Sequence, residues 1–276
     1  AIRRNDVAAL SVAAGSIASA ELYAAAKADR VGFWADQARE LLQWREPFTQ
    51  ALDWSGAPVA RWFADGSLNV AENCLDRHVA AGLGDRVAIH WVGEPGDVRS
   101  ITYAELTDEV KRAANALADL GVVAGDRVAI YLPLVPEAVV AMLAVARLGA
   151  IHSVVFGGFS ADSLRSRIED AGAKVVITAD GGWRKGKVFA LKPAVDEALA
   201  AGPSTVEAVL VVRRGENEVA WAEGRDHWWH EAVGGASPEH EPEAFEAADP
   251  LFILYTSGTT GRPEGMLDTS AGFLLR

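Results

Sequence analysis

Cysteine is nearly absent from this sequence: the only one among 276 residues is Cys74. A single cysteine cannot form a disulfide within the chain, so the disulfide-rich class of small secreted domains is excluded. A free thiol is typical of proteins in a reducing compartment, and we therefore expect a cytoplasmic protein. Because Cys74 lies in the helical pattern NCLDRH, it is predicted to be a small core residue.

Positive charge is also scarce, since 26 Lys and Arg residues face 38 Asp and Glu residues and the formal net charge is -12. Nucleic-acid and membrane-surface binding both require a basic face, so neither kind of partner is expected. Any polyphosphate ligand must therefore be held by a local group of donors. No run approaches the roughly 18 apolar residues that span a bilayer. The Ala- and Ser-rich residues 1–20 also make a poor signal-peptide core.

The sequence is nevertheless 50% apolar, which is enough for a large core. We expect residues 1–85 to form a helical N-terminal extension, with helices near residues 21–28, 32–44 and 70–81. Residues 86–276 alternate short apolar β-runs with amphipathic helices, which predicts an α/β fold with a parallel sheet and helical crossovers. The predicted β-runs are residues 86–92, 98–103, 127–133, 152–156, 174–180, 206–212 and 251–255. The acidic stretch 213–250 is predicted to be a surface excursion carrying one short helix around residues 227–232.

The most informative segment is residues 251–265, LFILYTSGTTGRPEG, where an apolar run expected to be a buried strand leads into a loop of glycines and hydroxyls. Glycines allow positive φ and bring backbone N–H groups close to an anion, and the hydroxyls add further donors. The G-x-x-x-x-G-K pattern of a Walker loop is missing. The segment predicts a phosphate-binding loop, with an ordinary surface turn as the alternative. The predicted loop residues are Thr256, Ser257, Gly258, Thr259, Thr260, Gly261, Arg262 and Gly265.

A second group of residues suited to phosphate is the segment GGWRKGK, residues 181–187. Arg184, Lys185 and Lys187 place three cations around Gly186 in a chain that is otherwise acidic. By itself the pattern favours a basic turn that faces water, because runs of charge usually do. Residues 157–160, GGFS, predict a tight turn whose Ser160 caps the following helix.

The histidines show no convincing metal-ligand spacing. The closest pair, His227 and His230, lies in the Trp-rich segment DHWWHE, where packing is the better interpretation. The local sequence also supports no Ser-His-Asp or Cys-His nucleophile. We therefore predict neither a metal site nor a covalent nucleophile.

The loop TSGTTGRPEG resembles the signature TSG(S/T)TG-K-P-K-G of the adenylate-forming acyl-CoA synthetases. Other segments, including GDRVAIYLPLVPEAVVAMLA and HSVVFGGFSADSLRSRIEDA, are similar to the acetyl-CoA synthetases, the AMP-forming acetate:CoA ligases. This resemblance implies that acetate attacks the α-phosphate of ATP to give acetyl-AMP and pyrophosphate, and that the CoA thiol then displaces AMP. It implies ATP-phosphate binding by the loop, CoA-phosphate binding by Arg184, Lys185, Gly186 and Lys187, and Mg²⁺ accompanying ATP with no ligand identifiable in the sequence.

Three positions differ from the family pattern. Arg262 replaces the first lysine, Glu264 replaces the second, and Asp268 stands where a histidine is usual. The last two changes favour repulsion of a polyphosphate. At an effective dielectric constant of about 20, one charge pair at about 4 Å contributes ~4 kcal/mol, so the reversal at Glu264 should weaken ATP or pyrophosphate binding.

The enzymes of this family are more than twice as long as this chain, so the resemblance implies that it corresponds to their N-terminal part. The adenylation lysine and the acyl pocket of the family lie beyond the matching region, and we expect the chain alone to be inactive, with no catalytic residue of its own. A sheet that lacks neighbouring strands should also expose an apolar edge and helix face. Two alternatives stay open: a propionyl- or other short-acyl-CoA synthetase, and a non-catalytic truncated remnant that retains CoA-phosphate binding.

Overall fold

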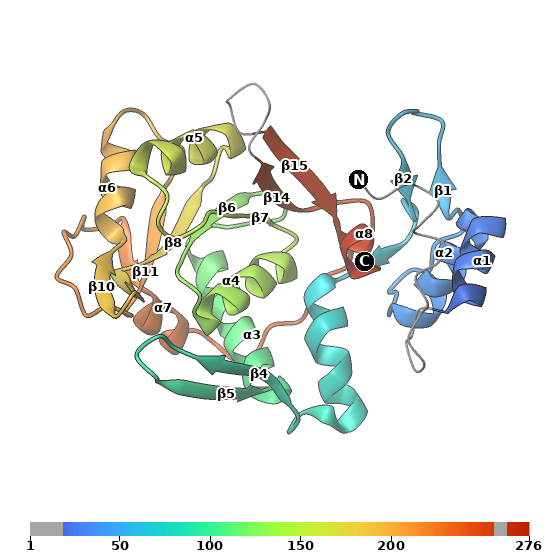
Figure 1. Ribbon diagram of the computed structural model, residues 1–276, viewed down its shortest axis with the longest axis horizontal. Helices are drawn as coiled ribbons and strands as arrows, with labels where there is room; N and C mark the ends of the chain where they lie inside the picture. The colour runs from blue at the N-terminus through green and yellow to red at the C-terminus, as the bar shows by residue number, and fades with distance from the viewer. Residues whose placement is uncertain (1–18, 257–263, 276) are drawn as a thin grey trace, which may run out of the picture.

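The computed structural model describes residues 19–256 and 264–275 (Figure 1). Its main feature is a seven-stranded sheet with the order β12-β11-β8-β6-β7-β14-β15. All neighbouring strands run parallel except β14 and β15, which are antiparallel. The strands are β6 (Arg127–Tyr131), β7 (Ile151–Val154), β8 (Val175–Ala179), β11 (Ala208–Val212), β12 (Asp226–Trp228), β14 (Pro250–Thr256) and β15 (Glu264–Thr269).

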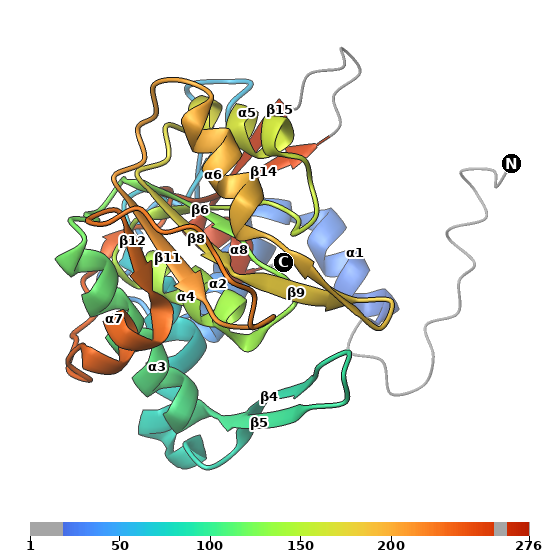
Figure 2. The same cartoon turned by 90° about the vertical axis from the view of Figure 1, so that its left-hand side faces the viewer.

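Helices cover both faces of this sheet. Helices α5 and α6 pack together on one face, and α3, α4 and α7 pack on the other (Figures 1 and 2). Every residue of the central strands β8 and β11 is buried, as expected for parallel strands covered on both sides. The predicted α/β alternation is therefore confirmed. The helices are α3 (Tyr103–Asp119), α4 (Pro136–Arg147), α5 (Ala161–Ala171), α6 (Lys192–Ala200), α7 (Trp229–Gly235) and α8 (Ser270–Leu274).

The first two predicted β-runs do not join the main sheet. They form β4 (Val87–Val92) and β5 (Val98–Thr102), an antiparallel hairpin that is a separate two-stranded sheet. Only residues 93–97 connect the two strands, and a parallel pair needs a crossover of about a dozen residues or more. A second hairpin, β9 (Gly181–Arg184) and β10 (Lys187–Ala190), contains the segment that the sequence suggested to be a basic turn.

The N-terminal region is mainly helical, as predicted. Its aromatic core brings the rings of Trp44, Phe48 and Phe63 within 4.6 to 5.9 Å of one another. The predicted helix over residues 70–81 is present but includes two π-helical segments. The elements are α1 (Ala20–Ala28), α2 (Arg30–Leu41), β1 (Leu52–Asp53), β2 (Arg61–Trp62), β3 (Ser67–Leu68), η2 (Glu72–Asp76) and η3 (Val79–Leu83), and β3 pairs with β13 (Phe245–Glu246).

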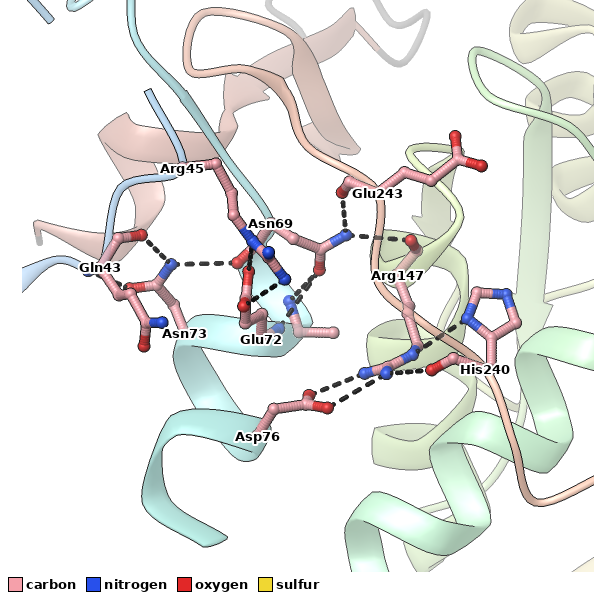
Figure 3. Close-up of polar contacts among 10 residues, drawn as sticks. Gln43, Arg45, Asn69, Glu72, Asn73, Asp76, Arg147, His240 and Glu243 are labelled. Carbon is pink, nitrogen blue, oxygen red and sulfur yellow. Dashed lines mark hydrogen bonds and ion pairs between the residues drawn. The ribbon is translucent and has the colours of Figure 1, made fainter. Parts of the chain in front are cut away.

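A network around Arg147 joins this region to the α/β core (Figure 3). Arg147 is at the end of α4, and its guanidinium forms two hydrogen bonds to the Asp76 carboxylate, at 2.7 and 3.1 Å. The same group donates to the carbonyl oxygen and Nδ1 of His240. Asn69 donates to the carbonyls of Arg147 and Glu243, so one network connects α4, η2 and the segment before β13.

The apolar edge and helix face expected from the sequence are present at β14, β15 and α8. Leu254 is 50% exposed and Met266 is 59% exposed, so β14 is not the fully buried strand that its apolar run predicts. The reason is its position next to the edge strand β15, at the end of the sheet. An apolar cavity of about 600 Å³ lies nearby and includes Cys74 and His152 in its lining. Cys74 is half-buried, and burial raises the pKa of its thiol. None of the helices within residues 19–256 and 264–275 is both long and apolar enough to cross a membrane.

The burial of His152 in β7 predicts that the stability of the protein depends on pH. Burial lowers the pKa of His152 from 6.5 to about 4, and its Nδ1 has no hydrogen-bond partner among the described residues. When the pH falls below 6.5, His152 binds a proton in the unfolded chain but stays neutral in the folded protein. The free energy of unfolding therefore decreases until about pH 4. We expect the histidine to contribute about 2 kcal/mol of destabilisation at pH 5 and almost none at pH 8.

The measurement is urea unfolding of the wild-type protein and His152→Leu at both pH values, where the leucine variant should gain relative stability at pH 5. Phe252→Leu is the matched control, because it removes the ring stacked 5.4 Å from His152 but keeps the titrating group. A stability difference between wild type and His152→Leu that does not change with pH would contradict this prediction.

Candidate functional site

The candidate site lies where the parallel strands end. The carboxyl ends of β6, β7, β8, β11 and β14 meet at one edge of the sheet because these strands run in the same direction. β6 and β8 are neighbours, yet the chain leaves β6 toward β7 and leaves β8 toward β11, on opposite sides. Such a reversal opens a crevice at the carboxyl edge, which is the usual ligand position in open α/β sheets.

A cavity of about 380 Å³ occupies this position. Its walls come from the segments after β6, β7 and β11, from the β9–β10 hairpin and from the tip of the β4–β5 hairpin. The residues that line it are Trp91, Val92, Gly93, Glu94, Leu132, Pro133, Leu134, Val135, Phe156, Gly157, Trp183, Arg184, Phe189 and Arg214. Its mixed aromatic and polar lining suits a ligand with an apolar or ring-containing body and an anionic group.

The predicted cationic segment forms the tip of the β9–β10 hairpin beside this cavity. Arg184 pairs with Lys187 across the ladder, and Lys185 and Gly186 form the two-residue turn with φ of 53° and 71°. Two positive φ angles match the right-handed twist of a hairpin, and a lysine at the first of them is strained. The four residues are exposed, and the described part of the chain forms no ion pair with any of the three cations.

A buried charged residue at each end of this hairpin holds it to the core. Asp180, which is 1% exposed, precedes β9 and accepts hydrogen bonds from the backbone N–H groups of Gly181, Arg214 and Gly215 at 2.7 to 2.8 Å. Lys192 follows β10 and donates to the Asp226 carboxylate at 2.8 Å, with both side chains fully buried. The cationic tip is therefore exposed while its base is held by the core.

The β4–β5 hairpin lies across from β9 (Figure 2), and residues at its tip line the cavity. Glu94 at its tip accepts a hydrogen bond from the Gly186 N–H at 2.5 Å. Asp97 forms a bidentate ion pair with Arg214, whose guanidinium lies 5.0 Å from the Trp91 ring centroid. Sequence reasoning missed Glu94, Asp97 and Arg214, because only the fold brings these separate segments together. In the sequence, the glycines and proline of GEPGD, residues 93–97, indicate only a turn.

The predicted GGFS turn forms the neighbouring wall. A Cβ on Gly157 would lie 2.7 Å from the Leu132 carbonyl oxygen, so only glycine allows the segments after β6 and β7 to approach this closely. Ser160 caps α5 by accepting a hydrogen bond from the Ser163 N–H, which confirms the predicted cap. The Tyr131 hydroxyl donates to the Phe159 carbonyl and holds the turn against β6.

The predicted phosphate loop follows β14 at the same edge of the sheet. Its central residues, Ser257, Gly258, Thr259, Thr260, Gly261 and Arg262, lie outside the described residues. The strands on either side bring Thr256 opposite Glu264 and Tyr255 opposite Gly265. Counting neighbouring strands at about 4.8 Å each, β14 lies about 14 Å from β8 and the base of the cationic hairpin. The two predicted phosphate-binding segments thus follow or adjoin strands that end at the same edge of the sheet.

Tyr255 joins the end of β14 to α5. Its hydroxyl donates to the Asp170 carboxylate at 2.6 Å, and the guanidinium of Arg167 lies 5.5 Å from its ring centroid. Burial and then Asp170 raise the pKa of Tyr255 far above its usual value, so its hydroxyl stays protonated and donates throughout the physiological range. For Mg²⁺, no group of three His, Cys, Asp or Glu with metal-binding geometry occurs within residues 19–256 and 264–275, and no ligand is assigned.

Two sequence profiles match the chain. The profile described as AMP-binding enzyme matches residues 76–274, and the profile described as acetyl-coenzyme A synthetase N-terminus matches residues 19–74. The first profile covers more than half of the chain and includes the sheet, both hairpins and the cavity.

Several curated proteins named acetyl-coenzyme A synthetase are similar to the chain. The protein of Streptomyces avermitilis is 67% identical over 263 residues, which are 95% of this chain and 40% of the relative. The protein of Mycobacterium tuberculosis is 66% identical over 93% of this chain, and that of Pasteurella multocida is 52% identical over 92%. The chain spans about 40% of the length of these relatives.

Proposed function

This chain belongs to the family of AMP-binding enzymes, and we propose that it provides the N-terminal part of an acetyl-CoA synthetase. The reaction would join acetate and ATP to acetyl-AMP with release of pyrophosphate, and the CoA thiolate would then displace AMP. Residues 1–85 would form the N-terminal extension, and residues 86–276 the first portion of the AMP-binding domain. We also propose a cytoplasmic location, because a single free cysteine is typical of a reducing compartment.

The observation that carries this proposal is the unpaired cationic tip beside the carboxyl-edge cavity. Arg184, Lys185 and Lys187 would bind the nucleotide phosphates of CoA, and the Gly186 turn would present them. Three cations grouped in a protein with net charge -12 create a local positive potential that favours the binding of an anion. Aromatic residues of the cavity wall, such as Trp183 and Phe156, would contact the rest of the nucleotide.

The residues around the β14 loop would bind the ATP phosphates. Thr256 and Gly265 border the loop, and its hydroxyls and N–H groups would contact the β- and γ-phosphates together with Arg262. Catalysis of this kind depends on positioning and charge stabilisation, so it needs no nucleophile from this chain. Glu264 would oppose polyphosphate binding at the mouth of the loop, and the Arg262 guanidinium would offset part of that repulsion.

The relatives favour acetate over the other short acyl groups, because the proteins named above carry acetate in their names. Grafting the remaining portion of the Streptomyces avermitilis relative after Arg276 tests whether this chain supports adenylation. Acetate-dependent exchange of labelled pyrophosphate into ATP should exceed the exchange measured without acetate. No acetate-dependent exchange would favour the non-catalytic alternative.

The 276-residue chain itself should bind CoA more tightly than dephospho-CoA, because the cationic tip would contact the additional phosphate. Arg184→Ala should remove most of this preference, a loss of about tenfold in CoA affinity, since a charge-assisted contact contributes about 1.5 kcal/mol or more. Titration calorimetry at low salt measures both affinities. Lys27→Ala removes an exposed cation of α1 and is the matched control. Equal affinity of the wild-type chain for the two ligands would remove the CoA assignment.

A further inference from the structure

The tip of the β4–β5 hairpin places an acid within the candidate anion site. Glu94 accepts a hydrogen bond from the backbone N–H of Gly186, at the centre of the cationic turn. We propose that Glu94 is an internal substitute for the ligand phosphate: it occupies the Gly186 N–H in the free protein and is displaced when the phosphate of CoA binds. This inference rests on the proposed function, because the displacing anion is taken to be a CoA phosphate.

Hydrogen-bond geometry makes the two occupants exclusive. The Gly186 N–H has one hydrogen and points at the Glu94 carboxylate, so a phosphate can use this donor only after Glu94 leaves it. A phosphate bound by Arg184, Lys185 and Lys187 would also lie close to the carboxylate, and like charges repel. The charge of Glu94 must therefore oppose CoA binding as long as its side chain remains at the turn.

The same contacts explain why Glu94 can be displaced easily. None of the three cations of the turn forms an ion pair with Glu94 within the described residues, so a single hydrogen bond holds its carboxylate. The side chain is exposed, and β4 and β5 pair only with each other. A phosphate carries more negative charge than a carboxylate and offers more acceptor oxygens, so it competes well for the turn.

A separate contact keeps the hairpin in place during this exchange. Asp97, three residues after Glu94, holds Arg214 in a bidentate ion pair, and the indole N–H of Trp91 donates to the Leu134 carbonyl at 2.8 Å. Rotation of the Glu94 side chain therefore does not require the hairpin to leave the cavity wall. Replacement of the Glu94 carboxylate by a phosphate therefore requires movement of only this side chain.

The test compares the wild-type chain with Glu94→Gln, which keeps an acceptor for Gly186 and loses the charge. CoA should bind roughly two- to fivefold more tightly to the variant in low salt, the gain expected for removing one exposed like charge. The gain should shrink in high salt, because screening weakens the repulsion. Glu40→Gln is the matched control, since it removes an equal charge from the exposed face of α2. Pyrophosphate is a second probe that requires no recognition of CoA.

Two measurements separate the failure of this inference from the failure of the proposed function. If the wild-type chain prefers CoA to dephospho-CoA but Glu94→Gln binds CoA equally or more weakly, the function stands and Glu94 is not a phosphate substitute. If the wild type does not bind CoA but Glu94→Gln binds pyrophosphate more tightly than wild type, the CoA assignment is wrong. The inference that Glu94 competes with a bound anion is then still supported. Faster amide exchange at Gly186 in Glu94→Ala, measured without ligand, should confirm the contact, and unchanged exchange would overturn it.

Discussion

We expect Arg147→Ala to lower the free energy of unfolding by about 3 kcal/mol, because it removes the fully buried partner of an ion pair whose carboxylate is 22% exposed. Arg147 is 1% exposed and contacts Asp76 through two hydrogen bonds. The variant leaves the Asp76 carboxylate without its cation and removes both contacts to His240. Burial and then the Arg147 charge lower the pKa of His240, which therefore remains a neutral acceptor near pH 7. Urea unfolding at pH 7 measures the loss.

Arg61→Ala is the control, because Arg61 forms an exposed, 3.9 Å pair with Glu246 and should contribute about 1 kcal/mol or less. The double variant Asp76→Leu and Arg147→Met should recover much of the loss, since apolar residues of similar volume avoid the uncompensated buried charge. A destabilisation by Arg147→Ala no larger than that of Arg61→Ala would show that the Arg147 network does not hold the N-terminal region to the core.

The second large effect is expected at Asp180, the buried base of the cationic hairpin. Asp180→Asn should destabilise the protein by about 3 kcal/mol, because a neutral amide weakens the charge-assisted bonds to Gly181, Arg214 and Gly215. Its NH₂ group would also face the Asn217 N–H, which now donates to Asp180 at 3.2 Å. Because the same carboxylate orders the start of β9 and the Arg214 segment, the preference for CoA over dephospho-CoA should fall as well.

Asp65→Asn is the matched control for this variant. Asp65 also accepts hydrogen bonds from backbone N–H groups, those of Thr49 and Gln50, but it is exposed to water. Its replacement should therefore destabilise the protein by less than about 1 kcal/mol. If Asp180→Asn unfolds no more easily than Asp65→Asn and keeps the CoA preference, Asp180 does not support the hairpin.

The candidate site was only partly predictable. The three cations within residues 184–187 are visible in the sequence, and so is the glycine- and hydroxyl-rich segment after β14. The sequence did not distinguish a solvated basic turn from the tip of a hairpin beside a cavity. That distinction depends on Asp180 and Glu94, whose partners are distant in the chain: Glu94 and Gly186 are 92 positions apart.

By itself, the sequence determined most of the helices and the central strands of the sheet, because hydrophobic periodicity and capping residues act over a few neighbouring positions. The buried runs at β8 and β11 and the Ser160 cap belong to this class. Only the tertiary structure decided that β4 and β5 leave the main sheet, that the strand order reverses between β6 and β8, and that Arg147 joins three segments. These features depend on which surfaces bury one another and on where buried charges find partners. Both are properties of contacts between distant residues, and no local pattern encodes them.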